Sequence, residues 1–373
     1  MRNRPSVWAL MVFSLISSCK GGCVDEYSSF FCVPSDNQVC LTIDSLSLEC
    51  IQPEVSGISY VGYSDIFGDH LYFADRLFAS LYQFDKNGLF EKVVIRNGNG
   101  PHEIPISRFE GYCISDDGHH FFLDSSTNIF EYDKEFNLIN RLFCYWKKKI
   151  TKGKSYEQTD SYSTCWGDKV NLTVYNGKLY TNITGASETF NILAPDYYHL
   201  ARIIEPRDAQ TGDPYPLLGR LSPEVRYMTA FQGDYFRITK EGAFVVAYEA
   251  DDLMYVYDSC YQLQYAFGQP GYGMNKDYQP LSVNHFQETL SQELETRGRY
   301  TSLSLVGDLT FRTYLTGTPF METRLQIYNG TTFIGDVQVP DGFKVLGYIN
   351  PYYYSYFICD EDKELIRIYR FML

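Results

Sequence analysis

Past its N-terminus, the sequence of 373 residues has no run of about 18 to 20 apolar residues, the length that a membrane-spanning helix needs. We therefore expect no such helix in the mature protein. Positive charge is also scarce, because 32 Lys and Arg residues against 46 Asp and Glu residues give a formal net charge of -14 at pH 7. A surface that neutralises phosphates needs the opposite sign, so the sequence predicts no nucleic-acid partner.

Motifs of the common catalytic and metal sites are missing as well. The sequence contains no GxSxG nucleophile elbow, no HExxH helix and no CxxC pair. Its histidines are too dispersed to make a metal triad by local spacing: His70, His102, His119, His120, His199 and His285. We expect no cofactor and no metal. An enzyme is the less favoured interpretation, although side chains that converge from several strands need leave no motif.

Aromatic residues, in contrast, are abundant. With 33 Tyr, 26 Phe and 3 Trp, aromatic side chains make up 17% of the chain, and hydrophobic residues make up 45% against 21% charged. A chain of this composition can bury a large core, and aromatic side chains fit the pleated, half-buried surface of a β-sheet better than a helix. The composition favours a folded, all-β protein.

The N-terminus has the pattern of a bacterial lipoprotein signal. A cationic start precedes an apolar run at residues 7–16, and Ile16-Ser-Ser-Cys19 then resembles a lipobox, in which the signal peptidase cuts before the cysteine. We predict a signal peptide at residues 1–18, a lipid such as palmitate on Cys19, and a flexible tether at residues 19–38. An ordinary signal peptide with an incidental cysteine is the alternative. The predicted location is the bacterial cell envelope, with the protein anchored to the outer membrane on its periplasmic or surface face.

Ten cysteines fit an oxidising compartment. Four of them crowd the start of the mature chain, where one or two disulfides could hold a segment with little core: Cys23, Cys32, Cys40 and Cys50. Apart from Cys19, the remaining five lie in strand-like runs, where a free cysteine behaves as a small buried hydrophobe: Cys113, Cys144, Cys165, Cys260 and Cys359. The spacing does not determine the pairing, and zinc is the alternative to disulfides.

A degenerate repeat of strand couplets runs along the rest of the chain. In the clearest copy, Leu71–Asp75 is followed after a short turn by Leu81–Asp85, and each strand alternates apolar with polar residues before it ends at Asp. Similar couplets begin at Phe121, Leu179, Phe244, Leu309 and Tyr356. A spacing of about forty to seventy residues is typical of four-stranded, antiparallel propeller blades. The copies predict an all-β fold, a six-bladed β-propeller; a β-sandwich with coincidental similarity is the alternative.

The last copy ends at the C-terminus, which leaves the sixth blade one strand short. We expect an N-terminal strand to complete that blade and close the ring, since closure removes exposed sheet edges. The candidate strands are Val39–Ile43 and Gly57–Val61. The propeller domain is predicted to span residues 39–373.

The loop after the first blade reads Arg-Asn-Gly98-Asn-Gly100-Pro101-His-Glu103. Together with the couplets, this loop resembles the TolB-like and NHL-like six-bladed β-propeller lipoproteins of Gram-negative bacteria, which commonly carry a G-x-G-P-x-E loop between blades. A degenerate second copy without the Glu follows at Gly268–Gly273. The resemblance implies a propeller fold but no particular activity.

Two interpretations of the first loop remain open. Its glycines permit backbone N–H groups to cradle an anion, or the loop is an interblade turn in which Glu103 bonds the backbone or an arginine. The recurring carboxylates are simpler to interpret, because a residue that every blade requires is more easily a turn cap than a general acid. These carboxylates are Asp75, Asp85, Asp124 and Asp133.

Two insertions interrupt the repeat. The first contains Lys147, Lys148 and Lys149, and it is either a solvated loop or a contact for an acidic glycan, a lipid head group or a protein. The second, Ser282–Arg299, predicts an amphipathic helix that packs on the propeller or on a partner. Exposed aromatic rings are good stacking platforms for sugars and peptides. The candidates for ligand binding on insertions are Tyr156, Tyr162, Trp166, Tyr272 and Tyr278.

From these features we predict a cell-envelope lipoprotein whose β-propeller is a non-catalytic ligand-binding or scaffolding module. The expected partners are the membrane, through the lipid on Cys19, and a glycan, a peptide or an envelope protein. One alternative is a propeller hydrolase or lyase with a metal bound in the central channel. Another is a structural partner in an envelope complex, with the helix around Phe286 and the lysine-rich loop as its contacts.

Overall fold

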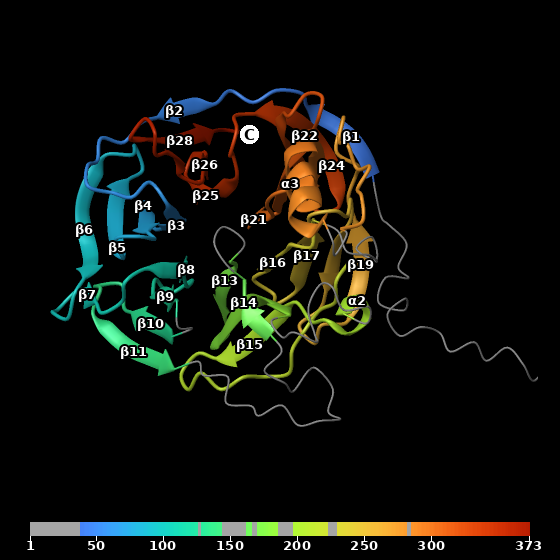
Figure 1. Ribbon diagram of the computed structural model, residues 1–373. Coiled ribbons are helices and arrows are strands. Elements are labelled where there is room, and N and C mark those ends of the chain that lie inside the picture. The colour runs from blue at the N-terminus through green and yellow to red at the C-terminus, as the bar shows by residue number, and fades with distance from the viewer. Residues whose placement is uncertain are drawn as a thin grey trace, which may run out of the picture.

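A computed structural model describes residues 38–125, 128–143, 162–165, 170–185, 197–222, 230–281 and 285–373. Over these residues the chain is nearly all β, and its six sheets stand around a common axis like the blades of a propeller (Figure 1). The predicted six-bladed β-propeller is therefore confirmed. No helix in this part of the chain is long and apolar enough to cross a membrane.

Each blade runs from an inner strand at the axis to an outer strand at the rim, and most neighbouring strands are antiparallel. Blade 1 contains β3 (Gly62–Phe67), β4 (His70–Asp75), β5 (Ser80–Asp85), β6 (Phe90–Asn97) and the short β7 (Glu103–Ile104). Blade 2 contains β8 (Phe109–Ile114), β9 (His120–Asp124), β10 (Asn128–Tyr132) and β11 (Leu138–Phe143). Blade 3 contains β12 (Tyr162–Thr164), β13 (Leu172–Tyr175), β14 (Lys178–Gly185) and β15 (Ile204–Asp208), and the short helix α2 (Tyr197–Leu200) precedes β15.

The second half of the ring follows the same plan. Blade 4 contains β16 (Asp234–Ile238), β17 (Phe244–Tyr248), β18 (Met254–Tyr257) and β19 (Leu263–Phe267). Blade 5 contains β20 (Arg297–Tyr300), β21 (Ser304–Val306), β22 (Leu309–Gly317), β23 (Thr323–Asn329), β24 (Thr332–Val339) and, from the N-terminal side, β1 (Gln38–Ile43). Blade 6 contains β25 (Val345–Ile349), β26 (Tyr352–Ser355), β27 (Ile358–Asp360), β28 (Leu365–Phe371) and β2 (Glu49–Ile51).

The middle strands of a blade are buried on both faces because a neighbouring blade covers each face. In β4, Leu71 and Phe73 pack into the apolar cluster between blades 1 and 6, whereas Tyr72 and Ala74 pack into the cluster between blades 1 and 2. Successive side chains of a strand point to opposite faces, so the couplet pattern in the sequence serves both interfaces. The core is therefore a set of clusters between blades.

Buried tyrosines account for much of the aromatic content. Their rings fill the clusters between blades, and their hydroxyls donate hydrogen bonds to backbone carbonyls of loops and of one outer strand. Tyr132 donates to Glu103 O at 2.8 Å, Tyr354 to Lys86 O at 2.8 Å, and Tyr248 to Arg220 O at 2.7 Å. Each of these rings is fully buried, so the hydroxyls tie the loops to the core.

An N-terminal strand closes the ring, but it is neither of the two runs proposed from the sequence. The closing strand is β2, whose residues Glu49–Ile51 pair antiparallel with β28 of blade 6. Val39–Ile43 lies in β1, which instead pairs in parallel with the outer strand β24 of blade 5. Figure 1 shows β1 and β2, both blue, against these two neighbouring outer edges. Gly57–Val61 forms no strand. Alternating apolar and polar residues indicate that a segment forms a strand, but they do not indicate which sheet edge the strand will join. The prediction of the closing strand was wrong for this reason.

The recurring aspartates are turn caps, as the sequence predicts. Asp85 Oδ1 accepts the backbone N–H groups of Asn87 and Leu89, both at 2.8 Å. Asp133 Oδ1 does the same for Glu135 and Asn137 in blade 2. Such Asx turns occupy the carboxylate with backbone donors and leave no free acid for catalysis at these positions.

Helix α3 (Phe286–Thr296) lies inside the segment predicted to be an amphipathic helix. Leu294 packs against the cluster between blades 3 and 4. Glu293 is the buried residue of the helix; it accepts the Gln279 N–H at 2.9 Å and pairs with Arg297 at 3.2 Å. The helix therefore packs on the propeller, which is one of the two arrangements that its apolar stripe allows.

Of the described cysteines predicted to be buried hydrophobes, Cys113 is buried, Cys165 and Cys359 are partly buried, and Cys260 is not buried. Burial raises the pKa of the Cys113 thiol in β8, and it raises the pKa of the Cys359 thiol in β27 to about 12. Cys260, predicted to lie in a strand-like run, is exposed in the turn after β18. The pairing of the N-terminal cysteines stays a prediction, because Cys23 and Cys32 lie outside the described residues.

Candidate functional site

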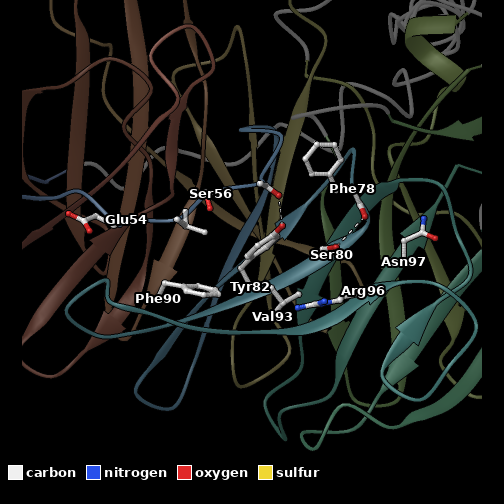
Figure 2. Close-up of a pocket in the computed structure, with 11 residues that line it drawn as sticks. Glu54, Ser56, Phe78, Ser80, Tyr82, Phe90, Val93, Arg96 and Asn97 are labelled. Atoms are coloured by element: carbon white, nitrogen blue, oxygen red, sulfur yellow. Dashed lines mark hydrogen bonds between the residues drawn. The ribbon is translucent and has the colours of Figure 1, made fainter.

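A cleft of about 510 Å³ lies where the ring is closed, between blade 1 and the segment that follows β2. One wall is the segment 54–57, which leads from β2 in blade 6 to β3 in blade 1. Side chains of blade 1 form the floor and the opposite wall: Phe78, Tyr82, Phe90, Val93 and Arg96 (Figure 2). We call this hollow the seam cleft.

Hydrogen bonds fix the wall of the seam cleft to blade 1. The Tyr82 hydroxyl donates to Gly57 O at 2.9 Å. Just beyond, the Ser59 N–H and hydroxyl both donate to the Asp75 carboxylate at 2.6 Å, and Asp75 is fully buried. The same carboxylate accepts the Phe78 N–H at 2.9 Å. The wall and the turn that carries Phe78 are therefore held by one buried acceptor, so the cleft is preformed.

Three aromatic side chains supply the apolar surface of the cleft. Tyr82 and Phe90 lie with ring centroids 6.3 Å apart and ring planes tilted by 51°. Phe78 stands at the mouth and is 50% exposed. Burial raises the pKa of the Tyr82 phenol, the Asp75 charge adds to the effect, and the Arg96 charge opposes it. A flat apolar floor with a ring at its edge is suited to stacking against a ligand.

Two charged side chains, Glu54 and Arg96, also line the cleft, and both are exposed. Arg96 lies on β6, where its backbone pairs with Glu103 of β7, so its position is fixed by the sheet. Within the described part of the chain, neither side chain forms an ion pair. Both charges are therefore available to a ligand.

The loop with Gly98, Gly100, Pro101 and Glu103 begins directly after Asn97 of the cleft, and it joins β6 to β7 at the outer edge of blade 1. Glu103 Oε2 accepts the Gly100 N–H at 2.6 Å. Gly98 has a φ of +152°, and a Cβ atom there would lie 2.1 Å from the same Glu103 oxygen. The carboxylate of Glu103 thus occupies the position that an anion would take in a backbone nest. This contact is the one that the turn interpretation expects, in which Glu103 bonds the backbone.

Two of the predicted binding residues have described side chains, and neither lines the seam cleft. Tyr272, in the connection between blades 4 and 5, is 73% exposed, and the Arg324 guanidinium lies 5.1 Å from its ring. Tyr278 is partly buried, packs against the core beside Phe231 and donates to Gly298 O at 2.8 Å, so its ring is not an open platform.

Several predicted site residues cannot be placed. Tyr162 begins β12, and its backbone alone is described. Cys19, Lys147, Lys148, Lys149, Tyr156 and Trp166 lie outside the described residues. Their roles stay predictions.

Sequence reasoning missed the residues of the seam cleft. Glu54 and Arg96 belong to no motif, and they line one cleft only because the ring closes at this place. One feature of the sequence pointed to Phe78. Leu77 and Phe78 are two large apolar residues in the tight turn between β4 and β5, where polar residues are usual. An exposed apolar residue in a turn is a reason to suspect a contact.

A second hollow of about 660 Å³ lies between blades 2 and 3. In it, His119 Nδ1 lies 2.8 Å from Glu131 Oε1, and Nε2 lies 3.9 Å from Asp117 Oδ2. The Ser115 hydroxyl donates to the Asp117 carboxylate, and this hydrogen bond lowers the pKa of Asp117. Nevertheless, no group of three or more His, Cys, Asp or Glu side chains among the described residues could hold a metal ion.

Polar side chains near the axis join the inner strands. Arg237 of β16 donates to Asn171 Oδ1 of blade 3, and its Nη2 lies 3.5 Å from the Tyr356 hydroxyl of blade 6. Asp65 of β3 accepts the Ile114 N–H of β8 at 2.8 Å. Burial raises the pKa of Asp65 to about 6, against the effect of its backbone hydrogen bonds and of the Arg237 charge. These groups have partners within the protein and hold neighbouring blades together.

Comparison with solved structures supports the fold. A DUF4221-family protein from Bacteroides vulgatus superposes with a TM-score of 0.63 at 12% sequence identity, over 88% of this chain and 96% of that one. A protein from Bacteroides fragilis that is assigned as exported superposes with a TM-score of 0.57 at 12% identity, over 90% of this chain and 99% of that one. At this identity the likeness extends to the fold alone. No protein-family model and no curated protein matches the sequence.

Proposed function

We propose that the protein is a cell-envelope lipoprotein, anchored through Cys19, whose β-propeller binds a ligand in the seam cleft without catalysing a reaction. The observation that carries this proposal is the preformed cleft itself. It combines an exposed ring, an apolar floor and two unpaired charges on a wall and a sheet that hydrogen bonds hold rigid. Rigid sites avoid the cost of ordering loops on binding, so such a cleft favours affinity.

The envelope location is supported by two observations. The N-terminal sequence resembles a lipobox signal, and the structurally similar protein from Bacteroides fragilis is assigned as exported. Membership of the TolB-like or NHL-like lipoproteins is part of the same proposal. The loop of Gly98 to Glu103 supports it, because that loop folds as a turn at the outer edge of blade 1, just before the chain enters blade 2. The membrane, through the lipid, and a glycan, a peptide or an envelope protein are the partners that we propose.

A binding titration tests the proposed function. The mature protein, solubilised in detergent, is titrated with a panel of oligosaccharides and short peptides in a thermal-shift assay, and hits are measured by calorimetry. A ligand at about a hundred times its dissociation constant stabilises the protein by roughly 2.7 kcal/mol, which is readily detected. We expect a hit whose affinity falls in Phe78→Ala. Silence across the panel contradicts a small-ligand site, and an unmodified Cys19 in mass spectrometry contradicts the lipid anchor.

A further inference from the structure

Arg96 differs from the other arginines in what its head group contacts. In the part of the chain that the structure describes, every other guanidinium donates a hydrogen bond, pairs with a carboxylate or lies over an aromatic ring. Arg76, for example, pairs with Glu110 at 2.7 Å, and Arg312 donates to Tyr248 O at 2.9 Å. The Arg96 guanidinium makes none of these contacts with the described residues, although Arg96 lines the seam cleft. Its N–H donors are therefore available to a ligand.

The Arg96 head group lies beside the apolar floor of the cleft. Figure 2 shows this side chain extending along the floor toward Val93. Burial raises the pKa of the Tyr82 phenol, and the Arg96 charge opposes this effect, so the positive charge acts on the floor. The Glu54 carboxylate, in contrast, is directed away from the rings of Tyr82 and Phe90 (Figure 2). Of the two charges that line the cleft, the one that faces the floor is therefore positive.

The rest of the cleft supplies apolar surface and one available hydroxyl. The rings of Tyr82, Phe90 and the half-exposed Phe78 line it. On the wall, the Ser56 hydroxyl has no hydrogen-bond partner among the described residues, so it can bond a polar group of the ligand. A volume of about 510 Å³ is typical of small-molecule sites.

From this arrangement we infer that the ligand of the seam cleft carries a carboxylate beside a flat apolar face, and that Arg96 binds the carboxylate. This inference rests on the proposed function and names the chemical class of its ligand. The planar guanidinium presents parallel N–H donors that match the two oxygens of a carboxylate. The rings of Tyr82, Phe90 and Phe78 contact the apolar face. Two sources supply this chemistry: a uronic acid residue of a glycan, whose C–H groups form the apolar face, and an aromatic carboxylic acid.

The experiment compares each acid with a neutral derivative of similar shape. The first pair is trigalacturonate and its fully methyl-esterified form, and the second pair is 3-phenylpropionate and 3-phenylpropanamide. Each compound is titrated into the mature, detergent-solubilised protein, and the dissociation constants are compared. In at least one pair we expect the acid to bind about tenfold more tightly, because only the acid forms charge-assisted hydrogen bonds with Arg96. The pair that shows this preference identifies the source of the carboxylate.

The variant Arg96→Gln assigns the preference to this side chain. It should weaken binding of the acid about tenfold and leave the affinity of the neutral derivative within about twofold, so that the preference disappears. Arg96 is exposed and pairs with Glu103 of β7 through its backbone, so the change should not affect folding. The matched control is Lys134→Gln, which removes an exposed positive charge from a turn of blade 2 and should leave both affinities unchanged within about twofold.

The outcomes separate this inference from the proposed function. Equal binding of acid and neutral derivative in both pairs overturns the carboxylate inference, and so does a preference for the acid that survives in Arg96→Gln. If a peptide or a neutral oligosaccharide binds in a manner sensitive to Phe78→Ala but not to Arg96→Gln, the carboxylate inference fails and the ligand-binding function stands. If no compound of either series binds, both fail.

Discussion

The Asp75 carboxylate accepts both the backbone N–H and the hydroxyl of Ser59 at 2.6 Å, although sixteen positions separate the two residues in the chain. Asp75 also accepts the Phe78 N–H at 2.9 Å. One buried carboxylate thus fixes the segment that follows the ring-closing strand and the turn that carries the exposed ring of the seam cleft. Ring closure and the candidate site share a single anchor.

Replacement of that anchor should weaken the fold and the site together. In the native protein, both oxygens of the Asp75 carboxylate accept hydrogen bonds from these donors. Asp75→Asn leaves a single acceptor oxygen, so we expect the free energy of unfolding to fall by about 1–3 kcal/mol. Ligand affinity at the seam cleft should fall as well. Urea denaturation followed by tyrosine fluorescence measures the first effect. Asp133→Asn, at an exposed turn where water replaces the lost acceptor, is the control and should cost less.

Closure of the ring by β2 predicts a strong dependence on the core of its partner strand. Ile368 of β28 is fully buried and pairs with Ile51 of β2. Ile368→Ala should lower the free energy of unfolding by about 2–5 kcal/mol, because it removes buried methyl groups and leaves a cavity. Ile139→Ala, in the outer strand of blade 2 at a side chain that is 50% exposed, should change it by less than about 0.5 kcal/mol. Equal effects in thermal denaturation would contradict closure through β28.

Acid should destabilise the interface between blades 1 and 2 through His120. Burial lowers the pKa of this imidazole to about 3, with a smaller contribution from the charge of His119, and Nδ1 lies 2.8 Å from the Tyr112 hydroxyl. Between pH 6.5 and pH 3 the unfolded chain binds a proton at this position that the folded chain does not. The free energy of unfolding therefore falls as the pH falls through this window, by about 2 kcal/mol at pH 5.

The variant His120→Gln isolates this effect, because Gln can still bond Tyr112 but does not titrate. Its free energy of unfolding, measured by urea denaturation at pH 7 and at pH 5, should fall less on acidification than that of the parent protein. His285→Gln, at an exposed imidazole, should behave like the parent. The Asp65 carboxyl acts in the opposite sense: its pKa is raised to about 6, so its contribution to stability is lost as the pH rises from about 4 to 6. An identical pH response in His120→Gln and the parent would contradict the role of His120.

Phe78 should matter to the ligand but not to the fold. Its side chain is half exposed, so Phe78→Ala should leave the free energy of unfolding within about 0.5 kcal/mol of the parent value. Loss of a stacking ring should weaken ligand binding by about 1 kcal/mol or more, which is at least fivefold. Leu89→Ala removes an exposed apolar side chain of blade 1 that does not line the cleft, and it should leave both quantities unchanged. Calorimetry and thermal denaturation measure the two quantities separately.

Local chemistry made the strand couplets and their turns predictable. The alternation in Leu71–Asp75 and Leu81–Asp85 arises because each blade is covered on both faces, and it is visible within a few residues. Asp85 and Asp133 cap turns through backbone groups two and four positions away, so their role is also local. The number of blades followed from counting such units.

What the tertiary structure decided is which distant segments meet. The strand β2 is three residues long and has no pattern that distinguishes it, yet it closes the ring, because the unpaired edge of β28 is available only after six blades have stacked. The seam cleft forms at that junction, and its residues Glu54 and Arg96 come from opposite sides of it. A sequence determines a strand through its neighbours in the chain, but a site between blades depends on contacts that exist only once the ring has closed.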